Sequence, residues 1–141
     1  MNQEIKVRLA TTKDLRIIQG FQVEMEHPIE ENPMPDEDGR KGVDYILSKS
    51  PLHGFYLVAK INKEIIGCLR ISYERSVSSN GTYWWIQNVF VSKIHRKKGV
   101  FQYLYKKVIN MTSANEDIVG IKLHVHKNNL AAQKAYEKAG M

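Results

Sequence analysis

The 141-residue chain has very little cysteine and no long apolar stretch. Its one cysteine, Cys68, cannot form a disulfide within the chain and cannot supply a cysteine-based zinc site. No window approaches the roughly 18 consecutive apolar residues that a membrane helix needs. The N-terminus has no apolar run behind a basic start, which argues against a secretory signal. These absences predict a cytoplasmic protein without a membrane partner, and the length predicts one domain over residues 1–141.

The residues that are present distribute their charge unevenly. The composition, 43% hydrophobic and 26% charged, is ordinary for a globular protein, and the formal net charge is +6. Residues 93–141 hold ten Lys/Arg against three Asp/Glu, whereas residues 24–38 hold seven of the fifteen acids. Two interpretations stay open. Both regions are solvated surface, or the basic half meets an anionic partner and the acidic segment meets a cationic one.

The hydrophobic periodicity predicts an α+β sheet covered by helices. Strands are expected at residues 5–9, 55–61, 65–73, 83–91 and 121–125. Helices are expected at about residues 12–25, 43–50, 99–109 and 129–139, and a loop at 27–42, where three prolines and two glycines lie. Short turns at 62–63 and 78–81 join the middle strands as hairpins, so this part of the sheet is predicted to be antiparallel.

A basic turn between a buried strand and a helix is the segment best suited to chemistry. It reads Val91-Ser92-Lys93-Ile94-His95-Arg96-Lys97-Lys98-Gly99-Val100-Phe101. Amides at a helix start lack intrahelical partners, and the helix dipole places partial positive charge there. Such a turn suits a compact anion such as a pyrophosphate, and Gly99 lets the backbone approach it closely. A solvated basic turn on a structural helix is the alternative.

Two motifs resemble the signatures of the GNAT superfamily of N-acetyltransferases. Arg96-Lys97-Lys98-Gly99-Val100-Phe101 is similar to its R-x-x-G-x-G/A signature for acetyl-coenzyme A, although Phe101 replaces a small residue. Residues 129–141, Asn-Leu-Ala-Ala-Gln-Lys-Ala-Tyr-Glu-Lys-Ala-Gly-Met, are similar to its signature N-x-x-A-x-x-x-Y-E-K-x-G-F/M. Residues 8–14 and 66–67 also match the family's layout. The resemblance implies a GNAT-type mixed, mostly antiparallel sheet flanked by helices, without the strands that follow in the family after the position of Met141.

The resemblance also implies acetyl-CoA as cosubstrate and no metal. The pantetheine arm is expected to pair with the backbone of Val89, Phe90 and Val91. The pyrophosphate is expected to lie against the amides of Arg96, Lys97, Lys98, Gly99, Val100 and Phe101. Asn129 is implied to contact the pantetheine or, alternatively, only to cap the last helix. Tyr136 matches the tyrosine that protonates the departing thiolate.

The implied reaction is direct attack of a primary amine on the thioester in a ternary complex. An alkyl ammonium must first lose a proton, so a carboxylate acting through water is the expected base. Glu24, Glu26 and Glu74 are the candidates, and Glu24 and Glu74 are preferred. The acidic segment favours a cationic acceptor: a polyamine, an aminoglycoside-like amine or a lysine side chain.

Two alternative functions stay open. One is a GNAT-fold protein that binds acyl-CoA without catalysis, which the large Phe101 favours. The other is a basic nucleic-acid-binding module, but no nucleic-acid motif is present and no nucleic-acid partner is expected. His124 and His126, at alternate positions of an expected strand, could join His95 at a metal, yet no carboxylate or cysteine accompanies them. Cys68 is expected in the core, and an unpaired strand edge near residues 121–125 suggests a homodimer.

Overall fold

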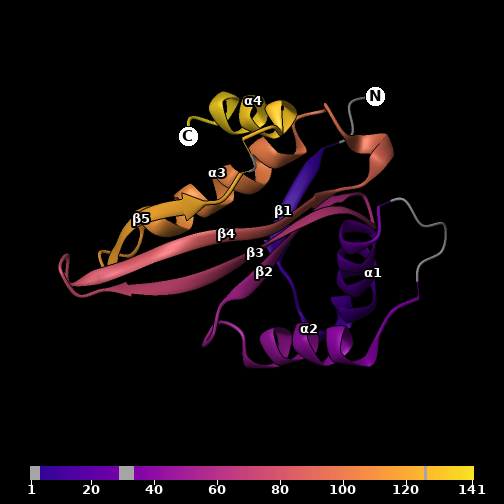
Figure 1. The fold of residues 1–141 in the computed structure, drawn as a ribbon, viewed down its shortest axis with the longest axis horizontal. Coiled ribbons are helices and arrows are strands. Elements are labelled where there is room, and N and C mark those ends of the chain that lie inside the picture. The colour runs from indigo at the N-terminus through magenta and orange to yellow at the C-terminus, as the bar shows by residue number, and fades with distance from the viewer. Residues whose placement is uncertain (1–3, 29–33, 126) are drawn as a thin grey trace.

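The computed structural model describes residues 4–28, 34–125 and 127–141. The strands are β1 (Ile5–Leu9), β2 (Phe55–Ile61), β3 (Glu64–Ser76), β4 (Gly81–Val91) and β5 (Ile118–Leu123). The helices are α1 (Leu15–Glu26), α2 (Glu37–Lys49), α3 (Val100–Ser113) and α4 (Leu130–Lys138), with short 3-10 helices η1 (Thr12–Asp14) and η2 (Lys93–His95). The strands form one sheet in the order β1-β2-β3-β4-β5, with α1 and α2 on one face and α3 and α4 on the other (Figure 1).

The sheet is antiparallel except at its last strand. β1, β2, β3 and β4 pair antiparallel in chain order, and β5 pairs with β4 in parallel. This arrangement confirms the predicted mixed, mostly antiparallel α+β fold. The expected strand at residues 121–125 was wrong in its bounds, because β5 begins at Ile118 and its ladder stops where Leu123 meets Ile86.

The central strands are buried on both faces because helices cover both sides of the sheet. Leu57 and Leu69 pack with Leu104 on the side of α3, and Val58 and Cys68 pack on the side of α1 and α2. Cys68 is 1% exposed, and this burial raises the pKa of its thiol to about 12. The burial confirms that Cys68 is a core residue, and a thiol with a raised pKa is a poor nucleophile at neutral pH.

Helix α2 begins six residues before the expected position at Val43, so the prediction of a loop through residue 42 was wrong. A carboxylate oxygen of Asp36 accepts a hydrogen bond from the amide of Gly39 and caps the helix. Arg40 forms an ion pair with Glu37 at 2.7 Å. A glycine inside a helix lowers the stability of the helix by about 1 kcal/mol relative to alanine, and a good N-cap raises it by about the same amount. Burial of the apolar face of α2 against the sheet then decides in favour of helix.

The start of α1 is tied to β1 by an ion pair. Arg8 donates to both carboxylate oxygens of Asp14 at 2.8 and 3.0 Å, and the amide of Thr11 donates to the same carboxylate at 2.8 Å. The guanidinium of Arg8 therefore lowers the pKa of Asp14. From this anchor α1 crosses the sheet and stacks Phe21 on Phe90 of β4, with 4.5 Å between ring centroids. No helix in the described part of the chain is long and apolar enough to cross a membrane.

Candidate active site

Strand β4 carries a bulge next to the point where β5 stops pairing with it. Cys68 of β3 lies opposite Phe90 and Arg70 lies opposite Gln87, so β4 has one more residue than β3 in this interval. Asn88 takes up the difference with a left-handed backbone, φ 53°. Because β5 pairs with β4 only as far as Ile86, the far edge of β4 from Gln87 to Val91 has no strand partner among the described residues.

This open edge offers backbone donors and acceptors to an extended ligand. Val89, Phe90 and Val91, the three residues expected to pair with a pantetheine arm, all lie on it. The ring of Phe90 packs away from the edge against Phe21, so only its backbone is available there. The carbonyl of Val91 already accepts a hydrogen bond of 2.9 Å from Nε of Arg96.

After β4 the chain forms a basic turn with two left-handed residues. Lys97 has φ 63° and Gly99 has φ 80°. Left-handed residues in a turn are typical of the anion-binding concavities that successive backbone amides form. Gly99 is the N-cap of α3, and no described side chain caps it. The first bond of the helix runs from the amide of Tyr103 to the carbonyl of Gly99 at 3.4 Å. The amides between these two residues therefore face outward at the positive end of the helix dipole.

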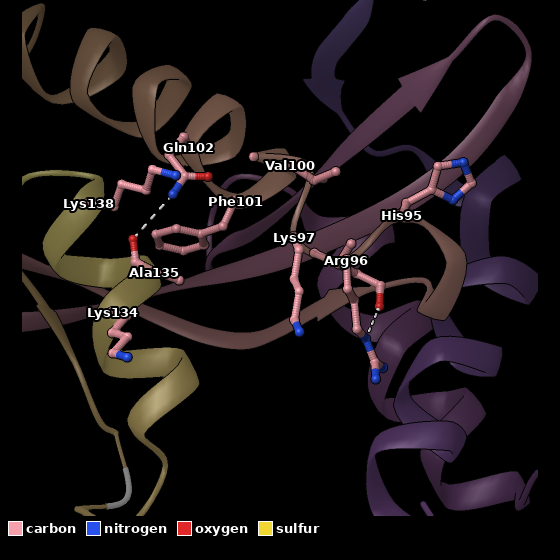
Figure 2. A pocket seen from close by; sticks show the side chains of 11 residues that line it. His95, Arg96, Lys97, Val100, Phe101, Gln102, Lys134, Ala135 and Lys138 are labelled. Carbon is pink, nitrogen blue, oxygen red and sulfur yellow. Dashed lines mark hydrogen bonds between the residues drawn. The ribbon is translucent and has the colours of Figure 1, made fainter.

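A cavity of about 290 Å³ lies in front of this turn. Figure 2 shows the turn with Arg96 and Lys97 on one side and α4 with Lys134 and Lys138 on the other. Nε2 of Gln102 donates to the carbonyl of Ala135 at 3.4 Å and joins α3 to α4. The residues that line the cavity are Val91, His95, Arg96, Lys97, Gly99, Val100, Phe101, Gln102, Lys134, Ala135 and Lys138.

The donor set of this first cavity fits a diphosphate. Its described lining holds outward amides and several basic side chains but no Asp or Glu. A Cβ on Gly99 would meet only Oε1 of Gln102, at an ordinary contact distance of 3.5 Å, so the space in front of this residue is open. Lys98 is exposed and does not line the cavity. Sequence reasoning missed Lys134 and Lys138, whose signal was their spacing of four residues on one helix face.

Phe101 is a core residue at the edge of the first cavity. It is 6% exposed, and its ring stacks on Tyr105 with centroids 5.9 Å apart. On its other side the ring of Tyr136 lies 5.0 Å away at 60°. The bulk that departs from the GNAT signature therefore packs between α3 and α4 (Figure 2).

A second cavity, of about 460 Å³, lies on the other side of Tyr136. Tyr136 lines it, while the preceding Ala135 lines the first cavity, so α4 borders both. Burial raises the pKa of the Tyr136 hydroxyl. The contact between Phe101 and Tyr136 makes the two cavities neighbours. The residues that line the second cavity are Met25, Arg70, Ile86, Gln87, Asn88, Val89, His124 and Tyr136.

Polar side chains of β3 and β4 form a connected array in the wall of the second cavity. Nε of Arg70 donates to Oδ1 of Asn88 at 2.9 Å, and its Nη2 donates to Oε1 of Gln87. Gln87 in turn donates to Oγ of Ser72 at 2.9 Å. Sequence reasoning missed this array, although two adjacent amide side chains in an otherwise apolar strand were its visible signal.

Neither preferred carboxylate is among the described residues that line the second cavity. Glu24 lies exposed on α1, one residue before the cavity residue Met25. Glu74 lies on β3 and accepts hydrogen bonds from Nε1 of Trp85 at 2.7 Å and from Nζ of Lys122 at 3.3 Å. These two donors lower the pKa of Glu74 and make it a weaker base.

The remaining candidates have structural partners. Oδ1 of Asn129 accepts from the amide of Ala132 at 3.0 Å, so Asn129 is the N-cap of α4. His124 follows the end of β5, so its expected place on the strand was wrong, and its ring stacks on Trp85 at 4.5 Å. His126 lies outside the described residues. Nδ1 of His95 lies 2.7 Å from Oγ of Ser92, and the described residues hold no cluster of three or more His, Cys, Asp or Glu suited to a metal ion.

The open strand edge, the basic turn and the two neighbouring cavities together form a candidate site in which an amide-rich, basic end lies beside a second cavity. The acetyltransferase (GNAT) family model matches residues 19–141. The structure is similar to a possible acetyltransferase from Clostridium difficile 630, with 33% identity, 97% of this chain and 90% of that chain covered, and a TM-score of 0.83. The chain belongs to the GNAT family, whose members use acetyl-CoA, and is an acyltransferase.

More distant structures share the fold. An aminoglycoside N-acetyltransferase in complex with CoA is 17% identical, with 100% of this chain and 90% of that chain covered and a TM-score of 0.80. An aminoglycoside acetyltransferase from an uncultured soil metagenomic sample, in complex with sisomicin, is 16% identical, with 97% and 88% covered and a TM-score of 0.76. No curated protein matches the chain.

Proposed function

We propose that the protein transfers the acetyl group of acetyl-CoA to a primary amine by direct attack in a ternary complex. The observation that carries the proposal is the contact between Phe101, which lines the first cavity, and Tyr136, which lines the second, with 5.0 Å between ring centroids. One cavity suits a diphosphate and the other has room for a small acceptor. Holding the two reactants together supplies effective molarities of about 10⁵ M or more, which is much of what this acyl transfer needs.

In this proposal the basic turn and the open edge of β4 hold the coenzyme. The amides from Arg96 to Phe101 bind the diphosphate, and Lys134 and Lys138 add attraction from α4. The backbone of Val89 and Phe90 pairs with the amide groups of the pantetheine arm, which directs the thioester toward Tyr136. Asn129 acts through its cap on α4, which positions Tyr136 and both lysines.

Acetyl-CoA, when bound, supplies an acetyl thioester. The amine nitrogen forms a bond to the carbonyl carbon, the bond from that carbon to sulfur breaks, and the hydroxyl of Tyr136 gives its proton to the sulfur. The proton that the amine loses needs a second acceptor. Of the described titratable side chains that line the second cavity, Tyr136 is the proton donor of this proposal, and the guanidinium of Arg70 has donors only and cannot accept a proton. His124 is then the proton acceptor that the cavity supplies.

The carboxylates preferred from the sequence have less support. Glu24 stays a candidate that acts through water from the rim beside Met25. Glu74 acts indirectly at most: it holds Trp85, and Trp85 stacks on His124. We therefore propose Glu74 as a positioning residue for the imidazole.

Replacement of His124 tests the proton acceptor. We expect His124→Asn to lower kcat by about 10²-fold at pH 7, a typical size for loss of a general base. The rate should recover as pH rises, because an amine that is already deprotonated needs no base. The pH profile also depends on the other charged or ionisable groups around the imidazole. These are Lys122, Glu74, Arg70 and Tyr136. Rate measurements from pH 6 to 10 check this, and an equal loss at every pH would instead indicate a purely structural role.

The function itself is tested by two measurements on the purified protein. Release of free thiol from acetyl-CoA should depend on an added amine, and acetyl-CoA and CoA should raise the melting temperature. Binding of the coenzyme without amine-dependent thiol release would favour the non-catalytic alternative. Stabilisation by RNA that weakens steeply with salt, with indifference to CoA, would favour the nucleic-acid alternative.

The charge of the acceptor, the cellular location and the assembly state remain predictions. The cationic acceptor was inferred from the acidic segment, of which Glu30 and Glu31 lie outside the described residues and Glu37 pairs with Arg40. A cytoplasmic location rests on the composition. A homodimer paired along β5, the last strand of the described sheet, is checked by light scattering.

A further inference from the structure

We infer that the acceptor carries a carboxylate near its reactive amine and that Arg70 binds this carboxylate. The inference rests on the proposed function and deepens it by naming the acceptor class: an amino acid, or a molecule with an amino-acid-like end. Its starting point is the positive charge of Arg70 in the second cavity, because a purely cationic acceptor would need negative charge there.

Arg70 is a permanent cation that has no anionic partner among the described residues. It is half buried, it lines the second cavity, and none of the described residues that line that cavity is an Asp or Glu. The other arginine of the same strand, Arg75, forms an ion pair with Asp117 at 2.8 Å. No ion pair joins Arg70 to a carboxylate anywhere in the described ranges. A guanidinium partly removed from water is stabilised by a countercharge, and here the open space beside it is the place for one.

Two hydrogen bonds orient the guanidinium of Arg70, and its outer N–H groups have no acceptor among the described residues. Asn88 and Gln87 accept one hydrogen bond each, from Nε and Nη2. Both acceptors are neutral amides, so they orient the side chain without cancelling its charge. Both Nη1 hydrogens and the second Nη2 hydrogen have no acceptor among the described side chains and backbone. Two parallel N–H bonds of this kind match the two oxygens of a carboxylate.

The array that holds Arg70 is itself anchored in the sheet. Gln87 donates to Ser72 across the ladder at 2.9 Å, and Asn88 occupies the bulge with its left-handed backbone. Left-handed residues other than glycine are held in place by their surroundings and gather at functional sites. The same cavity presents His124 and Tyr136, so a small molecule can place its carboxylate on Arg70 while its amine faces the groups proposed for proton transfer. A volume of about 460 Å³ suits a ligand of that size.

The test compares matched amines on the full-length protein with saturating acetyl-CoA. The panel holds α-, β- and γ-amino acids, each beside its carboxamide and its aminophosphonate. For the preferred amino acid we expect kcat/KM to exceed that of its carboxamide by about 10- to 100-fold, the discrimination that a hydrogen bond to a charged group provides. The aminophosphonate arm separates a carboxylate from a general oxyanion: the phosphonate should be the poorer acceptor, because its tetrahedral oxygens match the planar fork less well.

Variants locate the effect. Arg70→Gln should raise KM for the amino acid at least about tenfold and leave the carboxamide unchanged, and Arg70→Lys should keep only part of the preference. Arg75→Gln, on the same strand but paired with Asp117, is the matched control and should behave as wild type. Melting temperatures identify a variant that fails to fold, in which case the panel on wild type decides alone.

Binding and turnover separate the two proposals. Saturation-transfer NMR in the presence of CoA measures binding of the same amino acids without chemistry. Binding that needs Arg70 but leads to no acetylation would support the carboxylate site and refute the proposed acetyl transfer. Acetylation of amines with no preference for the carboxylate, equal losses for both substrates in Arg70→Gln, or no binding of any carboxylate would overturn the inference about Arg70.

Discussion

Gly99→Val is expected to weaken CoA binding by about 10²-fold or more, because it disturbs the amides that hold the diphosphate. Gly99 has φ 80°, a conformation that costs a β-branched residue roughly 1–2 kcal/mol before any ligand is bound. The space for a Cβ is not the obstacle, since its nearest neighbour would be Oε1 of Gln102 at an ordinary 3.5 Å. The expected damage therefore comes from a backbone that leaves the left-handed region and turns its amides away. Isothermal titration calorimetry with CoA measures it.

Arg96→Ala should cost much less, about three- to tenfold in CoA affinity, because an exposed charge is screened by water and salt. It also frees the carbonyl of Val91, to which Nε of Arg96 donates at 2.9 Å, and so adds an acceptor to the open edge. Gly99→Asn should fall between the two, since asparagine tolerates the left-handed region better than valine. Gly42→Ala, on α2 with nothing within 4 Å of the added Cβ, is the control. A larger loss for Arg96→Ala than for Gly99→Val would refute the account based on amides.

Tyr136→Phe is expected to lower kcat by about 10²-fold, the lower end of the range for a general acid, because a thiolate is a good leaving group even without a proton. Burial raises the pKa of the Tyr136 hydroxyl, so its proton should remain available up to a pH above the ordinary tyrosine value of about 10. Steady-state kinetics with saturating acetyl-CoA measure the loss. Over the neutral range the wild-type rate should show no decline from ionisation of this phenol.

The affinity for CoA should hardly change in Tyr136→Phe, because the ring that contacts Phe101 is kept. Tyr105→Phe is the matched control: Tyr105 also stacks on Phe101 but does not line the second cavity. A parallel fall of CoA affinity and kcat would mean that the hydroxyl positions the coenzyme and does not protonate the sulfur.

The helices and strands could be predicted from the sequence wherever the hydrophobic pattern alone determined the local structure. Apolar runs, alternating in β1 and apolar on both faces in β4, predicted the first four strands, and helical spacing predicted α1, α3 and α4 within a few residues. The start of α2 was misplaced because Gly39 and Gly42 suggest a loop, while a side-chain cap and burial of Val43 and Leu47 favour a helix. Burial is a property of the assembled molecule, so it could not be weighed from the segment alone.

The basic turn proposed to hold the coenzyme could be identified from the sequence because its residues are contiguous, whereas the second cavity could not. Its wall brings together Met25 of α1, Arg70 of β3, the bulge at Asn88 and Tyr136 of α4. These residues are dispersed along the chain, and the direction of each side chain depends on where the register of β4 shifts. Carboxylates were preferred as bases from their chemistry and from their expected places on the first helix and at a strand end near the cleft, but Glu24 and Glu74 are not among the described residues of that wall.

The edge of β4 from Gln87 to Val91, which has no strand partner among the described residues, should affect how well the protein stays in solution. Peptide groups along a strand edge that has no partner strand can pair with an extended segment of another molecule, including a second copy of the same chain. If acetyl-CoA pairs with this edge as proposed, we expect it to shield the protein against such mispairing. Preparations stripped of it should be the ones that precipitate on storage.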